Sequence, residues 1–163
     1  MAQFEARPRQ KVPREDPRVM RAIAKGYAEE LFAISEYTYA AILLQEALST
    51  AGALFSAISM DEMRHHRALG ELLRELGGSF ALSQTVRNTP YRLNEDEDSH
   101  AVVVARRILK DREREERAAV AFYKEIAAAA KTEAVRATLE AVARDEESHA
   151  AALCNLEKRL AYS

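Results

Sequence analysis

Asp145-Glu146-Glu147-Ser148-His149 is the stretch that decides the fold. Read as helix, it continues a seam, a row of residues at heptad spacing, that is otherwise apolar: Val135, Leu139, Val142, Glu146, His149, Leu153, Leu156 and Leu160. Steps of three and four residues point side chains into the core of a helical bundle. A carboxylate and an imidazole buried there without partners would be strongly destabilising. A cation bound between them would remove that penalty.

A second stretch, Asp61-Glu62-Met63-Arg64-His65, repeats the arrangement. It lies in an equally apolar seam of Phe55, Ile58, Glu62, His65, Leu69, Leu72 and Leu76. A Glu and a His three residues apart share one helix face and can bind one metal ion or two adjacent ones. One such pair could arise by chance in a chain rich in Glu. Two pairs inside apolar seams indicate a metal site.

Composition favours one all-α domain. The chain has 163 residues, with five Gly, four Pro and many Ala, Leu, Glu and Arg. A net charge of −2 argues against nucleic-acid binding. The single cysteine, Cys154, excludes a disulfide framework within the chain and is expected to be an inert packed thiol. Because neither a signal peptide nor an apolar run of spanning length is visible, we expect a cytoplasmic protein that does not enter membranes.

The pattern divides the chain into residues 1–16 and 17–163. The first segment is rich in Pro and Arg and has no apolar period, which favours a flexible basic arm over a specific docking peptide. Beyond it, the apolar periods predict helices at about 17–49, 53–76, 94–130 and from 132 to near the C-terminus. Residues 77–94 suit a long crossover. The sequence therefore predicts an antiparallel four-helix bundle with one long crossover between helices 2 and 3.

Local residues support these limits. Pro17 after Asp16 predicts a helix start, Thr132 predicts another, and Gly52 is expected to mark a tight connection. Asn94 and Glu97, three residues apart, resemble a capping box.

The two halves of the chain repeat each other. In each half a glutamate precedes an inward tyrosine by seven residues: Glu30 before Tyr37, and Glu116 before Tyr123. A Glu-x-x-His pair follows that glutamate after 62 − 30 = 32 residues in one half and 146 − 116 = 30 in the other. Two such hairpins packed antiparallel would bring four carboxylates and two imidazoles to one level of the core.

The predicted ligand set suits two metal ions. Four carboxylates carry a formal charge of 4 × (−1) = −4, which two divalent ions at 2 × (+2) = +4 would balance in a dry core. Mixed oxygen and nitrogen ligands suit iron or manganese. Carboxylates that bridge metals and change binding mode favour redox chemistry with oxygen or peroxide over hydrolysis.

The four segments together resemble the ferritin-like superfamily, closest to its rubrerythrin and bacterioferritin branches. The likeness covers about residues 20–160 and implies a di-iron centre, with manganese as an alternative. It implies the metal ligands Glu30, Glu62, His65, Glu116, Glu146 and His149, of which Glu62 and Glu146 would bridge. It also implies that Asp61 and Asp145 hold the histidines, and that Tyr37 and Tyr123 bond ligand carboxylates or supply an electron.

Several further residues near the predicted ligands either have two possible roles or are not expected to bind metal. Glu113 matches an additional rubrerythrin ligand, but it also belongs to a charged run that is typical of a solvated face. Glu36 leaves the seam and is expected at the surface. Met63 matches the position of a bacterioferritin haem ligand, although a packed methionine is the expectation. His100 is too far along its helix to join the site, and His66 is expected to be peripheral.

The resemblance implies a rubrerythrin-like peroxidase or ferroxidase, which couples Fe(II) oxidation to reduction of hydrogen peroxide or O2. The chain lacks the four cysteines of a rubredoxin domain, so the electron donor is expected to be another protein. Because 14 residues follow His149, a homodimer is expected rather than a cage. A di-manganese catalase, an O2-dependent hydroxylase and a non-catalytic iron-binding or interaction module are the alternatives.

Overall fold

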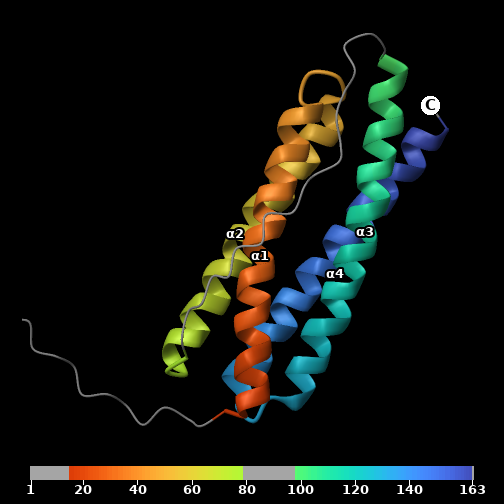
Figure 1. The fold of residues 1–163 in the computed structure, drawn as a ribbon. Coiled ribbons are helices and arrows are strands. Elements are labelled where there is room, and N and C mark those ends of the chain that lie inside the picture. Colours follow the sequence, from red (N-terminus) through yellow and green to blue (C-terminus); the bar gives the residue numbers. More distant parts are fainter. Residues whose placement is uncertain (1–14, 79–97, 163) are drawn as a thin grey trace, which may run out of the picture.

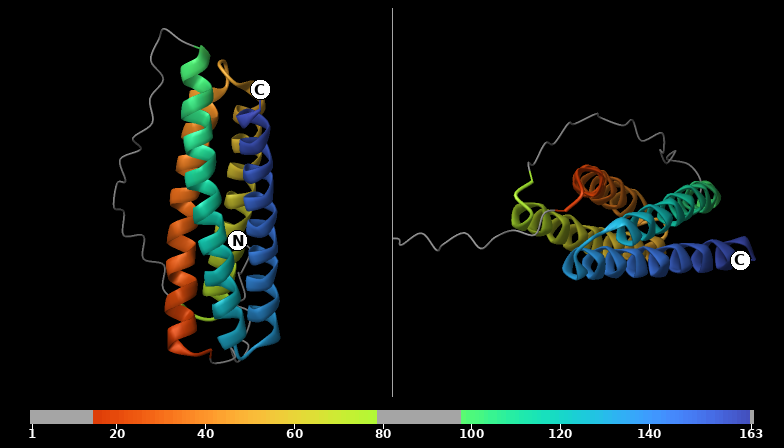
Figure 2. Two further views of the ribbon diagram at one scale, coloured as in Figure 1. Left: turned by 90° about the vertical axis from the view of Figure 1, so that its right-hand side faces the viewer. Right: turned by 90° about the horizontal axis from the view of Figure 1, so that it is seen from below.

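The chain forms an antiparallel four-helix bundle, as the heptad seams predict (Figure 1). The computed structural model describes residues 15–78 and 98–162. Their helices are α1 (Pro17–Leu44), α2 (Ser49–Glu75), α3 (Asp98–Ala129) and α4 (Glu133–Ala161). α1 packs chiefly on α2, and α3 on α4 (Figure 2). Because α2 and α3 run in the same direction, residues 76–97 must connect opposite ends of the bundle.

Two apolar clusters fill the two ends of the bundle. One contains Leu44, Phe55, Ile108 and Leu153, and the other contains Ile23, Leu69, Ile126 and Leu139, so each draws on all four helices. The predicted metal ligands lie between these clusters along every helix. The polar layer is therefore held in place by apolar packing on both sides.

The expected helix starts of α1 and α4 are confirmed. The Asp16 carboxylate accepts the amide proton of Arg18 at 2.8 Å, and the Thr132 hydroxyl accepts that of Val135 at 3.4 Å. The proposed capping box at residues 94 and 97 lies outside the described residues. Glu15, placed by the sequence in the arm, is buried and accepts the amide protons of Lys131 and Thr132. It thereby fastens the start of α1 to the α3–α4 turn.

The connection between α1 and α2 lies earlier than predicted. α1 ends at Leu44, and α2 begins at Ser49, so Gly52 is inside a helix and not in the turn. A Cβ atom on Gly52 would lie 2.9 Å from the Cα of Gln45. Gly52 therefore serves close packing of the turn against α2 rather than the turn itself.

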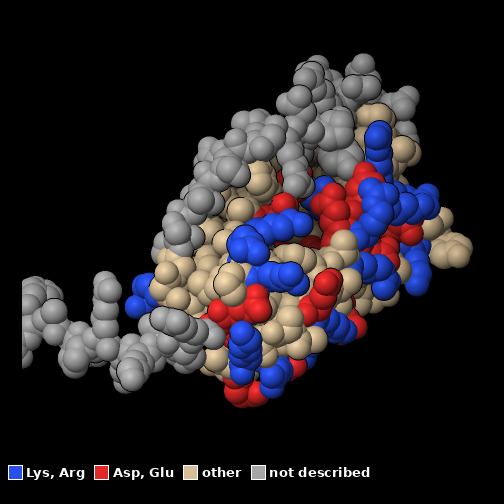
Figure 3. Space-filling view, turned by 60° about the horizontal axis from the view of Figure 1, so that its bottom comes forward, with Lys and Arg blue, Asp and Glu red and all other residues tan. Residues whose placement is uncertain are grey.

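Charges of both signs occur together on one face of the bundle. Lys and Arg side chains are interspersed with Asp and Glu on the face turned forward in Figure 3. Among the described residues, no helix combines the length and the apolar character that crossing a bilayer requires.

Replacement of Gly52 by Ala should destabilise the bundle, because backbone atoms of the turn cannot yield as a flexible side chain would. We expect a loss of about 1–3 kcal/mol in the free energy of unfolding, measured by urea denaturation. Ser56→Ala, at an exposed position of the same helix, should change that free energy by less than about 0.5 kcal/mol. An equal stability of both variants would contradict the packing role of Gly52.

Candidate metal centre

Six ionisable side chains meet in the middle of the bundle, and all four helices contribute. α1 and α3 each supply one glutamate, whereas α2 and α4 each supply a glutamate and a histidine one turn later. None of them exceeds 5% exposure: Glu30, Glu62, His65, Glu116, Glu146 and His149. The structure thus brings all six predicted principal ligands together.

The His65 imidazole faces three carboxylates with its Nδ1 atom. This nitrogen lies 3.1 Å from Glu62 Oε2, 3.2 Å from Glu146 Oε1 and 3.8 Å from Glu30 Oε2. The four residues come from α1, α2 and α4, and their donor atoms lie within 4.8 Å of one another. They form a first group that could hold a cation.

His149 occupies the equivalent place on α4. Its Nδ1 lies 3.1 Å from Glu146 Oε2, 3.2 Å from Glu62 Oε1 and 3.9 Å from Glu116 Oε2. The donor atoms of this second group also lie within 4.8 Å of one another, and the group shares Glu62 and Glu146 with the first. The two shared glutamates make the arrangement suitable for a pair of bridged ions.

The donor spacing fits metal ions. Donors bound at about 2.0–2.2 Å and separated by angles near 90–110° lie roughly 3.0–3.5 Å apart, close to the shorter distances between imidazole and carboxylate here. Glu62 Oε1 is fully buried without a hydrogen bond of good geometry, although it lies 3.2 Å from His149 Nδ1. A cation between this oxygen and nitrogen would satisfy both.

The Nε2 atom of each histidine contacts an aspartate on the other helix of the α2–α4 pair. His65 Nε2 lies 3.2 Å from Asp145 Oδ2, and His149 Nε2 lies 3.2 Å from Asp61 Oδ2. A carboxylate on Nε2 favours the tautomer with its proton there and leaves Nδ1 free to bind a metal. The two Asp-Glu-x-x-His stretches are therefore interlocked, with the aspartate of each serving the histidine of the other.

Two buried tyrosines connect α1 and α3 crosswise. Tyr37 on α1 donates its hydroxyl proton to Glu116, and Tyr123 on α3 donates to Glu30. Burial, followed by the neighbouring carboxylate, raises the pKa of both phenols, which keeps them protonated as donors. Tyr123 also depends on Gly26, because a Cβ there would lie 2.8 Å from the phenol oxygen.

In the protein without metal, the six groups share protons so that the layer is neutral. Burial raises the pKa of Glu30 to about 8 and that of Glu116 to about 10. Burial lowers the pKa of His149, but hydrogen bonds to Glu146 and Glu62 outweigh it and raise that pKa to about 10.

The remaining groups complete the charge balance. Burial also lowers the pKa of His65, yet hydrogen bonds to Glu146, Glu30 and Glu62 raise it well above its ordinary value. Burial raises the pKa of Glu146, but hydrogen bonds from the two histidines hold it at about 2. The pKa of Glu62 is lowered for the same reason. Two imidazolium groups then balance two carboxylates at neutral pH, while Glu30 and Glu116 keep their protons.

Glu113 lies outside both donor groups. It is half-buried, and it accepts hydrogen bonds from Arg117 at 2.8 and 3.0 Å on its own helix. Among the described residues, no group of potential metal ligands includes Glu113. Its role as an additional ligand therefore stays a prediction.

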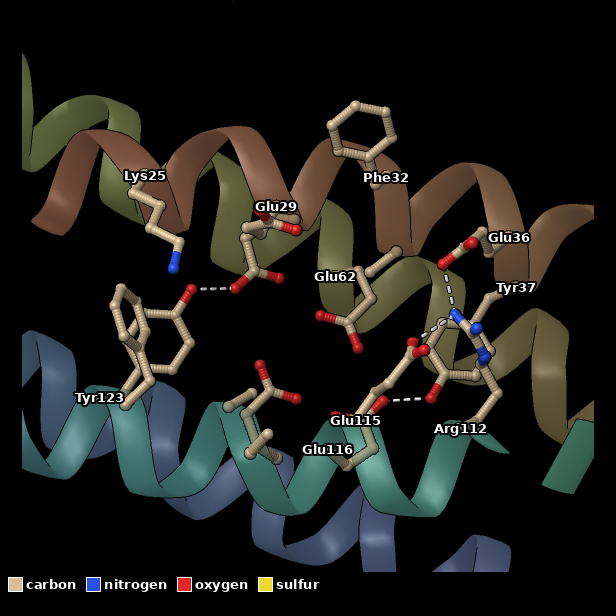
Figure 4. Close-up of a pocket in the computed structure, with 16 residues that line it drawn as sticks. Lys25, Glu29, Phe32, Glu36, Tyr37, Glu62, Arg112, Glu115, Glu116 and Tyr123 are labelled. Atoms are coloured by element: carbon tan, nitrogen blue, oxygen red, sulfur yellow. Dashed lines mark hydrogen bonds and ion pairs between the residues drawn. The ribbon is translucent and has the colours of Figure 1, made fainter. Parts of the chain in front are cut away.

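Sequence reasoning missed a buried ion pair beside the centre. Arg112 is only 8% exposed, although it belongs to a run interpreted as a solvated face. It pairs with Glu36 across the α1–α3 gap and with Glu115 at 2.7 Å (Figure 4). The expected surface position of Glu36 is therefore wrong. One signal was available, because Arg112 precedes Glu116 by four residues and so shares its helix face.

Four residues that were not predicted as ligands belong to neither donor group. The His66 Nδ1 atom donates to the carbonyl of Tyr27, on which its ring stacks. His100 is half-buried near the start of α3 and belongs to neither donor group. Met63 is 48% exposed, so it is not packed within this chain as expected. Cys154 is a half-buried free thiol.

Replacing Asp61 or Asp145 by Asn should weaken metal binding by about 10–100-fold, because the histidine loses the carboxylate that sets its tautomer. Equilibrium titration with Mn(II) measures this. Asp111→Asn, which changes an ion pair with Arg114 on the surface of α3, is the control and should bind as the wild type does. Unaltered affinity in both site variants would show that the aspartates do not support the ligands.

Metal affinity should rise with pH between 6 and 8. Across this range Glu116 and both histidines hold protons in the metal-free protein, and Glu30 is mostly protonated. A bound metal must displace these protons, so each one released should improve affinity by roughly tenfold per pH unit. Calorimetric Mn(II) titration in buffers of different ionisation enthalpy counts them. An affinity independent of pH would contradict the proton arrangement.

Comparisons with known proteins identify the family of this chain. The family model described as Rubrerythrin matches residues 22–157, which include every member of the two donor groups. The solved structure of Mycobacterium tuberculosis bacterioferritin, BfrA, is similar in fold, with a TM-score of 0.65 and 19% sequence identity. The match covers 92% of this chain and 90% of that one. A comparison with curated proteins gives no match. The chain belongs to the rubrerythrin family and has a ferritin-like four-helix bundle fold.

Proposed function

We propose that this protein is a di-iron oxidoreductase that couples Fe(II) oxidation to the reduction of hydrogen peroxide or O2, as a rubrerythrin-type peroxidase or ferroxidase. The observation that carries the proposal is the pair of buried donor groups that share Glu62 and Glu146. Mixed carboxylate and imidazole donors suit iron, with manganese as the alternative. Two iron ions bound there would supply the two electrons that reduction of one peroxide requires.

The proposed ligand roles follow the two donor groups. Glu30 and His65 would hold one ion, Glu116 and His149 the other, and the shared glutamates would bridge them. Tyr37 and Tyr123 orient the two terminal carboxylates through their hydroxyl protons. The same tyrosines are the proposed groups for local proton or electron transfer, because they touch those carboxylates directly.

The oxidant would reach the centre between α1 and α3. A cavity of about 350 Å³ on this side is lined by Glu30, Glu62, Glu116 and Glu146 (Figure 4). The two histidines, which α2 and α4 contribute, are absent from its lining. Open space therefore adjoins the carboxylates, while aspartates occupy the Nε2 side of the imidazoles.

We also propose a homodimer. Ile42 is 73% exposed, Met60 58% and Met63 48%, and these apolar side chains lie on α1 and α2. Burial of such side chains against a second copy would be favourable. Light scattering combined with size-exclusion chromatography measures the assembly state.

Stopped-flow mixing of the anaerobic Fe(II)-loaded protein with hydrogen peroxide, and separately with O2, tests the activity. We expect one peroxide to be consumed for two iron ions oxidised, followed through near-ultraviolet absorbance. Glu62→Ala removes a ligand shared by both groups and should slow oxidation by at least about 100-fold. Glu71→Ala, at an exposed position of the same helix, should leave the rate unchanged.

Three outcomes would count against the proposal. Inert behaviour toward both oxidants would reject it, and an unaffected Glu62→Ala variant would place the reaction elsewhere. Evolution of O2 from peroxide without any reductant would indicate a catalase instead. In the same assay, a slow Glu113→Gln variant would add Glu113 to the ligand set.

A further inference from the structure

The cavity beside the centre is larger than its proposed oxidant needs. Its volume is about 350 Å³, whereas one water molecule in the liquid takes about 30 Å³. Peroxide, with two heavy atoms, would occupy a small part of this space. Pockets that bind small organic molecules begin at about 300 Å³. The cavity therefore has room for a second, organic reactant.

Small side chains create this space. Ala33 on α1 and Ala118 and Ala119 on α3 line the cavity, and the rings of Tyr37 and Tyr123 lie at its two ends (Figure 4). From Lys25 to Glu36 the cavity follows α1 over 36 − 25 = 11 helical steps, roughly 16 Å of helix. It is an elongated cleft whose lining combines alanine and aromatic side chains with seven glutamates.

The two cations that line the cleft are each engaged by neighbouring side chains. Arg112 bridges to Glu36 at one end, and the Lys25 ammonium lies 5.2 Å from the centre of the Phe122 ring at the other. A planar aromatic molecule could bury its faces against the alanines and the aromatic rings, and removal of this apolar surface from water would favour binding.

We propose that this cleft binds an aromatic reductant of the hydroquinone class as the electron donor of the reaction. The inference rests on the proposed peroxidase function and names its reductant. Oxidation of a hydroquinone to the quinone releases two electrons and two protons. Cleavage of the O–O bond of hydrogen peroxide consumes both and yields two molecules of water, so the two half-reactions balance.

Internal symmetry supplies the variant that tests the cleft. The offset between α1 and α3 is 116 − 30 = 86 for the glutamates and 123 − 37 = 86 for the tyrosines, and Ala118 corresponds to Phe32 by the same offset. Ala118→Phe therefore places in α3 the residue that α1 already has. Ala33→Leu narrows the cleft from the opposite wall. Ala121→Phe, at an exposed position of α3 outside the lining, is the matched control.

Calorimetric titration of the Zn(II)-loaded protein with trimethylhydroquinone under anaerobic conditions measures binding without redox chemistry. We expect one molecule to bind per chain. Ala118→Phe should raise its dissociation constant at least about tenfold and Ala33→Leu somewhat less, because both occupy the ring's space. Ala121→Phe should remain within about twofold of the wild type. Circular dichroism and bound Zn(II) verify that each variant is folded.

A single-turnover experiment separates this inference from the proposed function. Iron-loaded protein is first oxidised by peroxide and then mixed with trimethylhydroquinone, and one quinone should form per peroxide consumed. If peroxide fails to oxidise the iron-loaded protein, the proposed function fails. If peroxide succeeds but the hydroquinone does not bind, or binds Ala118→Phe as tightly as the wild type, the inference is overturned. Reduction by a protein donor alone, or by a dithiol with no effect of Ala118→Phe, would overturn it equally.

Discussion

The structure depends on one constraint, which is that six ionisable side chains must be kept in the dry centre of the bundle. Removing a charged group from water costs several kcal/mol unless partners replace its hydration. Apolar clusters close the layer above and below, and the groups within it compensate one another through shared protons. The same neutrality can be reached with two divalent ions against four carboxylates. The layer is thus balanced in two states, which a site that takes up and releases metal needs.

The internal repeat meets this constraint with equivalent residues from both halves of the chain. The ligands, tyrosines and aspartates of one half match those of the other, and the contacts run crosswise between halves. The surroundings differ, however. Gly26 leaves space for Tyr123, while the corresponding residue, Arg112, is a buried cation near Tyr37 that bridges to Glu36. An equivalent pair of ligand groups consequently lies in a cleft whose two ends are chemically different.

Heptad spacing was sufficient to predict the bundle. It also predicted that Glu62, His65, Glu146 and His149 meet, because a polar residue at a heptad position of an apolar seam faces the core. It could not reveal which aspartate serves which histidine, since that depends on how α2 and α4 cross. The turn before α2 was misplaced because Gly52 suggests a loop, whereas it actually allows close backbone packing. Arg112 was missed because the charged run was interpreted as a solvated face, although its spacing of four residues from Glu116 places both on one helix face. The cleft arises from small side chains on two helices distant in sequence, so no local pattern reports it.

Anomalous-scattering measurement on crystals of the metal-loaded protein tests the central claim most directly. We expect two metal peaks per chain, one beside Nδ1 of His65 and one beside Nδ1 of His149, with Glu62 and Glu146 in contact with both. A single peak, peaks confined to surface carboxylates, or imidazoles that bind through Nε2 would contradict it.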